Sequence, residues 1–368
     1  MYFTSLSCAS YVPTSYRCTA FTLHATASSS KCHASASIFT PGLLSRPHRR
    51  TMGHQSQPTS SLLPPGAWDT HHHVFDPVAF PYSPTRHLTP PSASIAHYCA
   101  FKRSLGIANS TVVHGLSYGH DCRSLIHFLH DLQAPGVAVI SRQTTDSELA
   151  SLHAAGVRGI RLDLYSEDAM HDLGKQIDLL RYYCSRVAPW GWSVGFLQLN
   201  SANWEPLADI IPSLPADIVV DHCALLKAAS MLPSDMSVKA QPGMAPILRL
   251  LNQARNFWVK ISAPYRCSDS GPIYEDMQEV VRALLDANPG RIVWGSDWPH
   301  TPRMQVRSKE EALRETPYLQ VDDRCWLESL KDWLSEKEWR AIMVENPRRL
   351  FRTGTMPYVN DETVQAQL

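Results

Sequence analysis

Residues 68–77 read WDTHHHVFDP, and this stretch decides the fold that the sequence predicts. It has the length of a buried strand, and its polar residues gather toward the carboxyl end. The same unit recurs along the chain as a short apolar run, a polar end and then a longer amphipathic stretch with the helical period. Strands that alternate with helices in this order predict a parallel sheet.

Eight such strands can be counted from residue 68 onward. They are expected at 68–74, 110–117, 136–141, 157–164, 193–199, 217–222, 257–263 and 291–297. Helices are expected between them at 122–132, 146–155, 174–187, 245–256 and 274–287, and after them at 318–339 and 347–351. Asp146 is the expected N-cap of the second helix, and Asn288, Pro289 and Gly290 end the fifth. Eight β/α units in this order predict an α/β fold of the closed (β/α)8, TIM-type barrel class rather than an open doubly wound sheet.

The length of 368 residues suits a single barrel domain of roughly 250 residues with insertions. We expect this domain at 66–355 and a polar tail at 356–368. Residues 1–60 are rich in Ser, Thr, Ala and Pro and contain no acidic residue, so a disordered extension is expected there. A basic, Ser-rich segment of this kind also suits a mitochondrial transit peptide, and a start at Met52 would remove most of it.

The composition predicts a small-molecule substrate and argues against two other classes of partner. Lys plus Arg and Asp plus Glu number 34 each, so the formal charge is zero and no nucleic-acid partner is expected. No run of about 18 apolar residues occurs, so no membrane span is expected. Nine cysteines without a CxxC pair are typical of reduced thiols in a cytoplasmic protein. The sequence leaves the oligomeric state open.

Polar side chains at the carboxyl ends of the predicted strands indicate the candidate active site. A buried parallel strand is apolar throughout, and the catalytic groups of barrel enzymes converge at this rim. His71 and His73 share one face of the first strand because side chains alternate, whereas His72 should pack outside. His222 ends the sixth strand and Asp297 ends the eighth. We predict that His71, His73, His222 and Asp297 are catalytic, with Asp297 as a general base whose pKa burial would raise.

Further residues near this rim are predicted to contact the substrate. They are Arg161, Gln198, Tyr265, Arg266 and His300. The guanidiniums would provide forks for a substrate carboxylate, although Arg161 also suits an ion pair with Asp163. Asp69 and Asp221 are expected to hold hydrogen bonds behind the site. Cys223 is expected to be a small buried spacer rather than a nucleophile.

Six motifs occur in a specific order between residues 68 and 351. They are WDTHHHVFDP (68–77), RGIRLD (158–163), VVDH (219–222), VKISAPYR (259–266), IVWGSDWPH (292–300) and NPRRLF (346–351). Together they resemble the amidohydrolase-related family and, within it, the 2-pyrone-4,6-dicarboxylate lactonase-like hydrolases. The resemblance implies a distorted (β/α)8 barrel that hydrolyses a lactone or related ester. Asp297 would activate water, the three histidines would stabilise the carbonyl oxygen, and Arg161 and Arg266 would hold carboxylates.

The resemblance also bears on metal content. Metal-dependent members usually add a Lys or Glu on the fourth strand and a His on the fifth, where this chain has residues 161–163 (Arg-Leu-Asp) and Gln198. A two-metal site is therefore not expected, and a reaction without a cofactor is favoured. The alternative is one divalent ion such as Zn²⁺, held by His71, His73, His222 and Asp297.

Departures from the family pattern leave the substrate open. Glu167 stands near the place of an expected second arginine, residues 223–227 replace a glycine-containing loop, and His114 stands where glutamine is common. Two other functions stay possible at this point: a metal-dependent decarboxylase of an aromatic or unsaturated acid, and a non-catalytic ligand-binding barrel. Decarboxylases commonly place a proline soon after the HxH pair, but here the first proline is Pro77.

Overall fold

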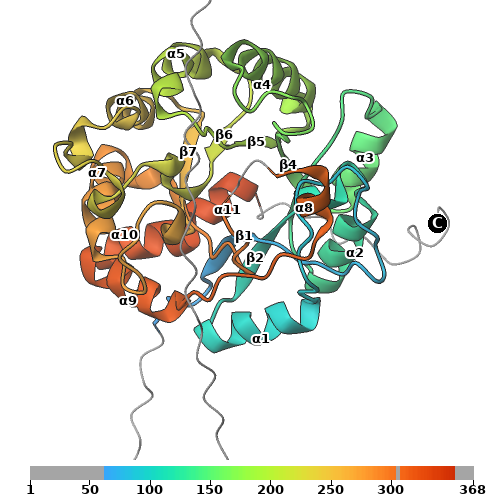
Figure 1. Ribbon diagram of the computed structural model, residues 1–368, viewed down its shortest axis with the longest axis horizontal. Helices are drawn as coiled ribbons and strands as arrows, with labels where there is room; N and C mark the ends of the chain where they lie inside the picture. Colours follow the sequence, from blue (N-terminus) through green and yellow to red (C-terminus); the bar gives the residue numbers. More distant parts are fainter. Residues whose placement is uncertain (1–61, 304–306, 353–368) are drawn as a thin grey trace, which may run out of the picture. The chain divides into compact units, whose positions relative to one another are not determined.

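The computed structural model describes residues 62–303 and 307–352. Eight parallel strands pair in sequence order and helices surround them, which confirms the predicted (β/α)8 barrel (Figure 1). The strands are β1 (Trp68–His72), β2 (Asn109–Val113), β3 (Gly136–Ala138), β4 (Val157–Arg161), β5 (Ser193–Phe196), β6 (Ile218–Val220), β7 (Phe257–Ile261) and β8 (Ile292–Trp294). Each lies within its predicted range except for the first residue of β2. The predictions for residues 1–60 and 356–368 fall outside the described residues.

The helices alternate with the strands and then close the chain. They are α1 (Ile95–Leu105), α2 (Arg123–Leu132), α3 (Asp146–Ala154), α4 (Leu173–Val187), α5 (Trp204–Ile210), α6 (Met244–Gln253), α7 (Gln278–Ala287), α8 (Lys309–Leu313), α9 (Asp323–Trp333), α10 (Glu336–Arg340) and α11 (Asn346–Phe351). The helices expected from the sequence did not include α1, α5 or α8. The predicted N-cap Asp146 is wrong, because the Thr145 hydroxyl accepts from Glu148 N and the Glu148 carboxylate accepts from Thr145 N.

The barrel closes just beyond the end of β8. Asp297 N donates a hydrogen bond to His71 O at 2.7 Å, and His73 N donates to Trp298 O at 2.8 Å. These bonds pair the end of β1 with the segment after β8. Closure therefore brings Asp297 next to both histidines of the first strand, although more than 220 residues separate them in the sequence.

The part of the barrel interior away from the carboxyl ends of the strands, called the lower core below, is apolar. It consists of Val113, Val137, Val219, Trp258 and Val293, together with Leu350 and Phe351 of α11. The Phe351 ring also stacks on Trp68 at a centroid distance of 6.4 Å. His72 points away from the interior and stacks on Tyr98 of α1 at 3.6 Å, as predicted. The buried quartet His71, His73, His222 and Asp297 lies at the other end of the barrel, toward the carboxyl ends of the strands.

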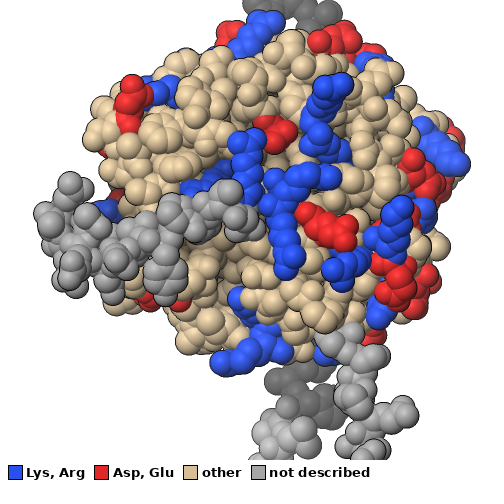
Figure 2. All heavy atoms as spheres, turned by 180° about the vertical axis from the view of Figure 1, so that it is seen from behind, with Lys and Arg blue, Asp and Glu red and all other residues tan. Residues whose placement is uncertain are grey.

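The molecular surface has mixed charge. On the side opposite to that of Figure 1, Lys and Arg side chains gather near the middle of the face, and Asp and Glu lie among them and toward the edge (Figure 2). Among the described residues, no helix combines the length and the apolar character needed to cross a membrane.

Candidate active site

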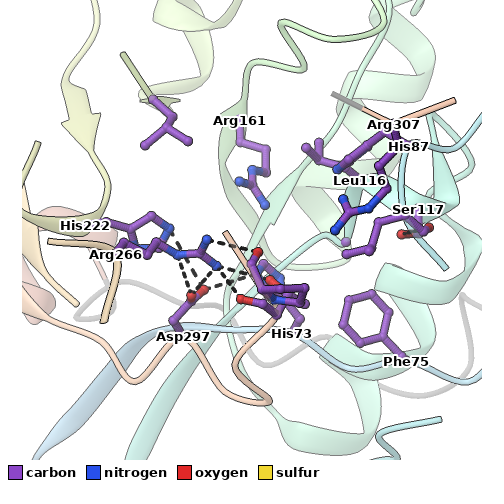
Figure 3. Close-up of a pocket in the computed structure, with 15 residues that line it drawn as sticks. His73, Phe75, His87, Leu116, Ser117, Arg161, His222, Arg266, Asp297 and Arg307 are labelled. Carbon is purple, nitrogen blue, oxygen red and sulfur yellow. Dashed lines mark hydrogen bonds and ion pairs between the residues drawn. The ribbon is translucent and has the colours of Figure 1, made fainter. Parts of the chain in front are cut away.

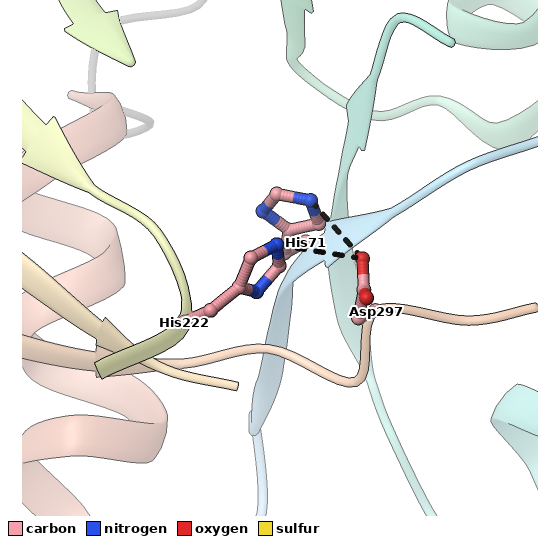
Figure 4. A group of neighbouring side chains, drawn as sticks. All are labelled: His71, His222 and Asp297. Carbon is pink, nitrogen blue, oxygen red and sulfur yellow. Dashed lines mark ion pairs between the residues drawn. The ribbon is translucent and has the colours of Figure 1, made fainter. Parts of the chain in front are cut away.

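The four predicted catalytic residues meet at one oxygen atom. Asp297 Oδ1 lies 3.4 Å from His71 Nε2, 3.6 Å from His73 Nε2 and 4.0 Å from His222 Nε2. All four side chains are buried. Figure 4 shows His71 and His222 turned toward Asp297 from β1 and from the segment after β6. The structure therefore brings the predicted quartet together.

The other carboxylate oxygen of Asp297 is held by two neighbours. Asp297 Oδ2 accepts hydrogen bonds from Tyr265 Oη at 2.6 Å and from Arg266 Nε and Nη2 at 3.2 and 2.9 Å. Arg266 also donates to the carbonyl oxygens of Thr301 and Pro302. Asp297 engages both side chains, and Arg266 also lines the cavity, so a substrate contact by either residue stays a prediction. They fix the carboxylate with Oδ1 facing the histidines.

The pKa of Asp297 is shifted in the direction opposite to the prediction. Burial alone would raise it, but the positive charge of Arg266 brings it well below the ordinary value of 3.8. Asp297 is therefore a carboxylate at any physiological pH.

The three imidazoles differ in the partner of the ring nitrogen Nδ1, which faces away from Asp297. His73 Nδ1 is 2.8 Å from the carbonyl oxygen of Val113, so it must donate, and the other ring nitrogen, Nε2, faces Asp297. His222 Nδ1 lies 2.9 Å from Ser262 Oγ, which already accepts from His222 N. Burial lowers the pKa of His71 to about 4 and that of His222 well below 6.5, so both rings are neutral at pH 7.

Behind His71 lies a buried ion pair that includes a residue the sequence analysis missed. Lys260 Nζ is 3.2 Å from Asp221 Oδ1, and His71 Nδ1 lies 3.1 Å from each of these two atoms. Lys260 is the only charged residue of β7 (FWVKI), and a charge within an apolar strand is the signal that could have identified it. Asp69 accepts a hydrogen bond from His71 N at 3.1 Å. The hydrogen bonds predicted for Asp69 and Asp221 are therefore present.

The site contains a group of atoms that could hold a divalent ion. His71, His222 and Asp297 each offer one ligand atom, and these atoms lie within 4.8 Å of one another. Asp297 Oδ1 and His71 Nε2 are buried and have no hydrogen-bond partner among the described residues. Two imidazole nitrogens and a carboxylate oxygen suit Zn²⁺, so the residues fit one ion.

A cavity of about 610 Å³, including its open mouth, lies above the quartet. Its wall includes His73, His222, Arg266 and Asp297 on one side and Arg161, His87 and Arg307 farther along (Figure 3). Arg161 is thus on the cavity wall, and no ion pair joins it to Asp163 among the described residues.

Two predicted substrate contacts lie away from this cavity wall. Gln198 donates to Gln176 Oε1 at 2.7 Å and accepts from Asn200 N, and Leu197 lines the wall beside it. His300 Nε2 lies 3.0 Å from Asp323 Oδ2 of α9. Both side chains are held by neighbours in the fold and are not presented to the cavity.

Cys223 has the surroundings of the predicted spacer. It is buried, and burial raises the pKa of its thiol well above 9.0, which disfavours the thiolate that a nucleophile requires. It lies in a turn in which His222 and the next three residues all have φ near +55°. This left-handed turn directs the His222 ring toward Asp297.

Comparison with known proteins identifies the family of this chain. The amidohydrolase family model matches residues 68–353. A 2-pyrone-4,6-dicarboxylate hydrolase of Comamonas testosteroni is 30% identical over 78% of this chain and 91% of its own length. A 4-sulfomuconolactone hydrolase of Rhizobium radiobacter is 31% identical over 81% of this chain and 93% of its own. A solved Agrobacterium tumefaciens structure is 25% identical, with a TM-score of 0.62 over 80% of this chain and 98% of its own. The protein therefore belongs to the amidohydrolase family and is a hydrolase.

Proposed function

We propose that the protein opens a small lactone, that is, a cyclic ester, which carries an anionic substituent. The observation that carries this proposal is the arrangement of Asp297, an ionised carboxylate with one oxygen fixed by Tyr265 and Arg266 and the other directed at three imidazoles. The names of two relatives, a pyrone dicarboxylate hydrolase and a sulfomuconolactone hydrolase, support a cyclic ester as substrate.

Asp297 and His73 are suited to hold the attacking water. Both present acceptors, Oδ1 and the Nε2 lone pair, 3.6 Å apart, and one water molecule has two protons to donate to them. As the water oxygen attacks the carbonyl carbon, Asp297 Oδ1 takes one proton. This role for His73 differs from the carbonyl contact that the family resemblance implied.

His71 and His222 are suited to meet the carbonyl oxygen. Lys260 Nζ and Asp221 Oδ1 each lie 3.1 Å from Nδ1 of His71, and we assign the hydrogen bond at Nδ1 to the Lys260 donor. Ser262 Oγ lies beside Nδ1 of His222. A proton donated to Nδ1 leaves the neutral ring with its own proton on Nε2, facing the cavity. Two such N–H groups would stabilise the oxyanion of the tetrahedral intermediate, and one oxyanion donor is typically worth about 3 kcal/mol.

The collapse of the intermediate breaks the ring C–O bond. Protonated Asp297 then gives its proton to the leaving oxygen, and the products are a carboxylic acid and a hydroxyl group on one open chain. A carboxyl whose pKa lies well below 3.8 is a strong acid once protonated, so this transfer is favourable.

We propose that these steps proceed without a metal. Arg266 contacts Asp297 and Lys260 contacts His71, so a dication bound between His71, His222 and Asp297 would meet two positive charges. If an ion does bind there, it would polarise the carbonyl and acidify water.

A panel of lactones tests the proposal, with CO₂ measured alongside acid release. We expect acid release at a rate that a chelator leaves unchanged, from protein whose metal content is far below one ion per chain. Loss of activity with chelator and recovery with Zn²⁺ would replace the metal-free reaction with a metal-dependent one. CO₂ release without lactone hydrolysis would contradict the proposed function and support the decarboxylase.

A further inference from the structure

The turn Pro264–Arg266, which follows β7 and carries both residues that hold Asp297 Oδ2, is bound by two cations from other loops. Lys227 Nζ donates to Arg266 O at 2.7 Å. Arg303 Nε and Nη2 donate to Tyr265 O at 2.9 and 2.6 Å. Lys227 belongs to the segment after β6 and Arg303 to the segment after β8. Loops from three neighbouring strands therefore meet at this turn.

The contact between the turn and the segment after β8 is reciprocal. Arg303 donates to Tyr265 O, while Arg266 Nη2 donates to Thr301 O at 2.9 Å. The same guanidinium holds the Asp297 carboxylate (Figure 3). A displacement of the turn would therefore move both the phenol and the guanidinium that fix this carboxylate.

The turn depends on these donors because it begins at a strained residue. Ala263 has a φ of +47°, and such a conformation persists in a non-glycine residue only where the surroundings hold it. Ala263 O accepts from Arg266 N at 2.9 Å, which closes the turn. The carbonyls of Tyr265 and Arg266 instead receive their donors from Arg303 and Lys227. Without these cations, two acceptors lose their partners and the turn can relax.

Lys227 is itself fixed in place by a buried side chain. Gln241 Oε1 accepts from Lys227 N at 2.7 Å, and Gln241 Nε2 donates to Lys227 O at 2.9 Å. Within residues 62–303 and 307–352, Lys227 forms no ion pair, and it does not line the cavity. The hydrogen bond from its half-buried ammonium to Arg266 O is charge-assisted, and such bonds are stronger than neutral ones.

We propose that Lys227 and Arg303 are positioning residues for the reaction. They hold the turn Pro264–Arg266 so that its phenol and guanidinium keep the Asp297 carboxylate directed at the histidines. This inference rests on the proposed lactone hydrolysis, because it assigns both residues a role in that reaction. Neither residue lines the cavity, so the loss of either should lower kcat and leave KM nearly unchanged.

The kinetic test compares Lys227→Met with Lys239→Met. Lys239 is an exposed lysine of the same connection between β6 and α6, and its side chain forms no hydrogen bond or ion pair with the described part of the chain. For Lys227→Met we expect kcat to fall about 10- to 100-fold at a nearly unchanged KM. Lys239→Met should match the wild type, and Lys227→Arg, which retains N–H donors, should recover much of the lost kcat. Equal kcat values for Lys227→Met and Lys239→Met would overturn the positioning role.

Two further variants keep this test decisive. Urea unfolding checks that Lys227→Met is folded, and Arg303→Met, which removes the other donor, should lower kcat in the same way. If Lys227 acts through Asp297, adding Lys227→Met to Asp297→Asn should leave the residual activity unchanged. A further loss of about 10-fold in this double variant would show that Lys227 acts by another route and would refute the proposal.

Hydrogen exchange separates this inference from the proposed function, because it needs no substrate. The amides of Cys267 and Ser268 donate to Pro264 O at 2.8 and 2.9 Å, so their exchange reports on the turn. By mass spectrometry we expect residues 264–268 to exchange about 10-fold faster in Lys227→Met, but not in Lys239→Met. If this pattern holds and no lactone is hydrolysed, the hydrolysis fails and the anchoring of the turn stands. If lactones are hydrolysed and Lys227→Met changes neither exchange nor kcat, the positioning role fails and the hydrolysis stands.

Discussion

The lower and upper parts of the barrel interior come from the same strands but have opposite chemistry. On β6, Val219 belongs to the apolar lower core, and two residues later Asp221 pairs with Lys260. On β7, Trp258 belongs to the same core, two residues before Lys260. Side chains two residues apart lie on the same face of a strand. On β6 and β7, the residue that follows the apolar core on that face therefore belongs to the polar group of the candidate active site. The apolar layer stabilises the barrel, and the positions of the polar side chains depend on that barrel.

The backbone shows the same contrast. Before β4 and β5, the left-handed positions of the lower loops are glycines, Gly156 and Gly191, although Gln133 takes this conformation before β3. At the mouth, residues with side chains take this conformation, including Ala224, Ala263 and Asp297. A non-glycine residue there costs about 1–2 kcal/mol, so the mouth stores strain that the lower core must offset.

Asp297→Asn should reduce activity more than any other substitution while it leaves stability nearly unchanged. Loss of the carboxylate removes the proposed base, and we expect kcat to fall roughly 10³-fold while the unfolding transition stays close to that of the wild type. Steady-state kinetics and urea unfolding measure the two effects. Near-normal activity of the variant would refute the assignment of Asp297.

Phe351→Ala should produce the reverse pattern. Phe351 is buried in the lower core against Trp68, and truncation of such a ring typically costs 3–5 kcal/mol of unfolding free energy. The kcat per folded molecule should not change, because no atom of the cavity wall moves. A variant with normal stability and reduced kcat would contradict the division between the two layers.

Lys260→Met tests the ion pair that joins the layers. The substitution leaves Asp221 buried without its cation, so we expect the free energy of unfolding to fall by about 3 kcal/mol. It also removes the proton donor beside Nδ1 of His71. The double variant Lys260→Met/Asp221→Asn should regain most of the stability because no unpaired charge remains, but not the activity. Recovery of both would assign Lys260 a purely structural role.

Asp69 should make stability depend on pH between about 4 and 6. Burial raises its pKa from 3.8 to about 6, so folding favours its protonated form. The corresponding stability is present in full below pH 3.8 and is lost as the pH rises through 6, an effect of about 2–3 kcal/mol. Urea unfolding at several pH values should show this slope in the wild type but not in Asp69→Asn. Parallel curves for the two proteins would disprove it.

Ala224→Gly should give the smallest effect. Because Ala224 has a φ of +55°, a conformation that glycine adopts without strain, we expect the free energy of unfolding to rise by about 0.5–1 kcal/mol. The matched control is Ala228→Gly, at a buried alanine with a φ of −79°, which should lose a similar amount. Melting temperatures of the two variants measure the difference. A loss of stability in both would show that the left-handed turn is not strained.

Local periodicity made a large part of this structure predictable. The placement of His71 and His73 on one face, and of His72 on the other, follows from the alternation of side chains along a strand. One-residue errors such as Asp146 for Thr145 arise because both residue types cap helices.

Contacts between distant segments were not predictable in this way. The sequence marked Arg266 and Tyr265 as polar, but only the fold pairs them with Asp297, about 30 residues away. It overlooked Lys260 and Arg307, whose neighbours come from other strands and loops. It also assigned Gln198 and His300 to the substrate, although Gln176 of α4 and Asp323 of α9 hold them.

By itself, the sequence determined the order of the eight strands and the quartet of His71, His73, His222 and Asp297, because strand period and strand ends are local properties. Only the tertiary structure determined the direction in which the pKa of each buried group is shifted. The pKa of a buried group depends on the neighbours that packing supplies. The pKa of Asp297 was expected to be raised by burial, and Arg266 instead holds it well below its ordinary value.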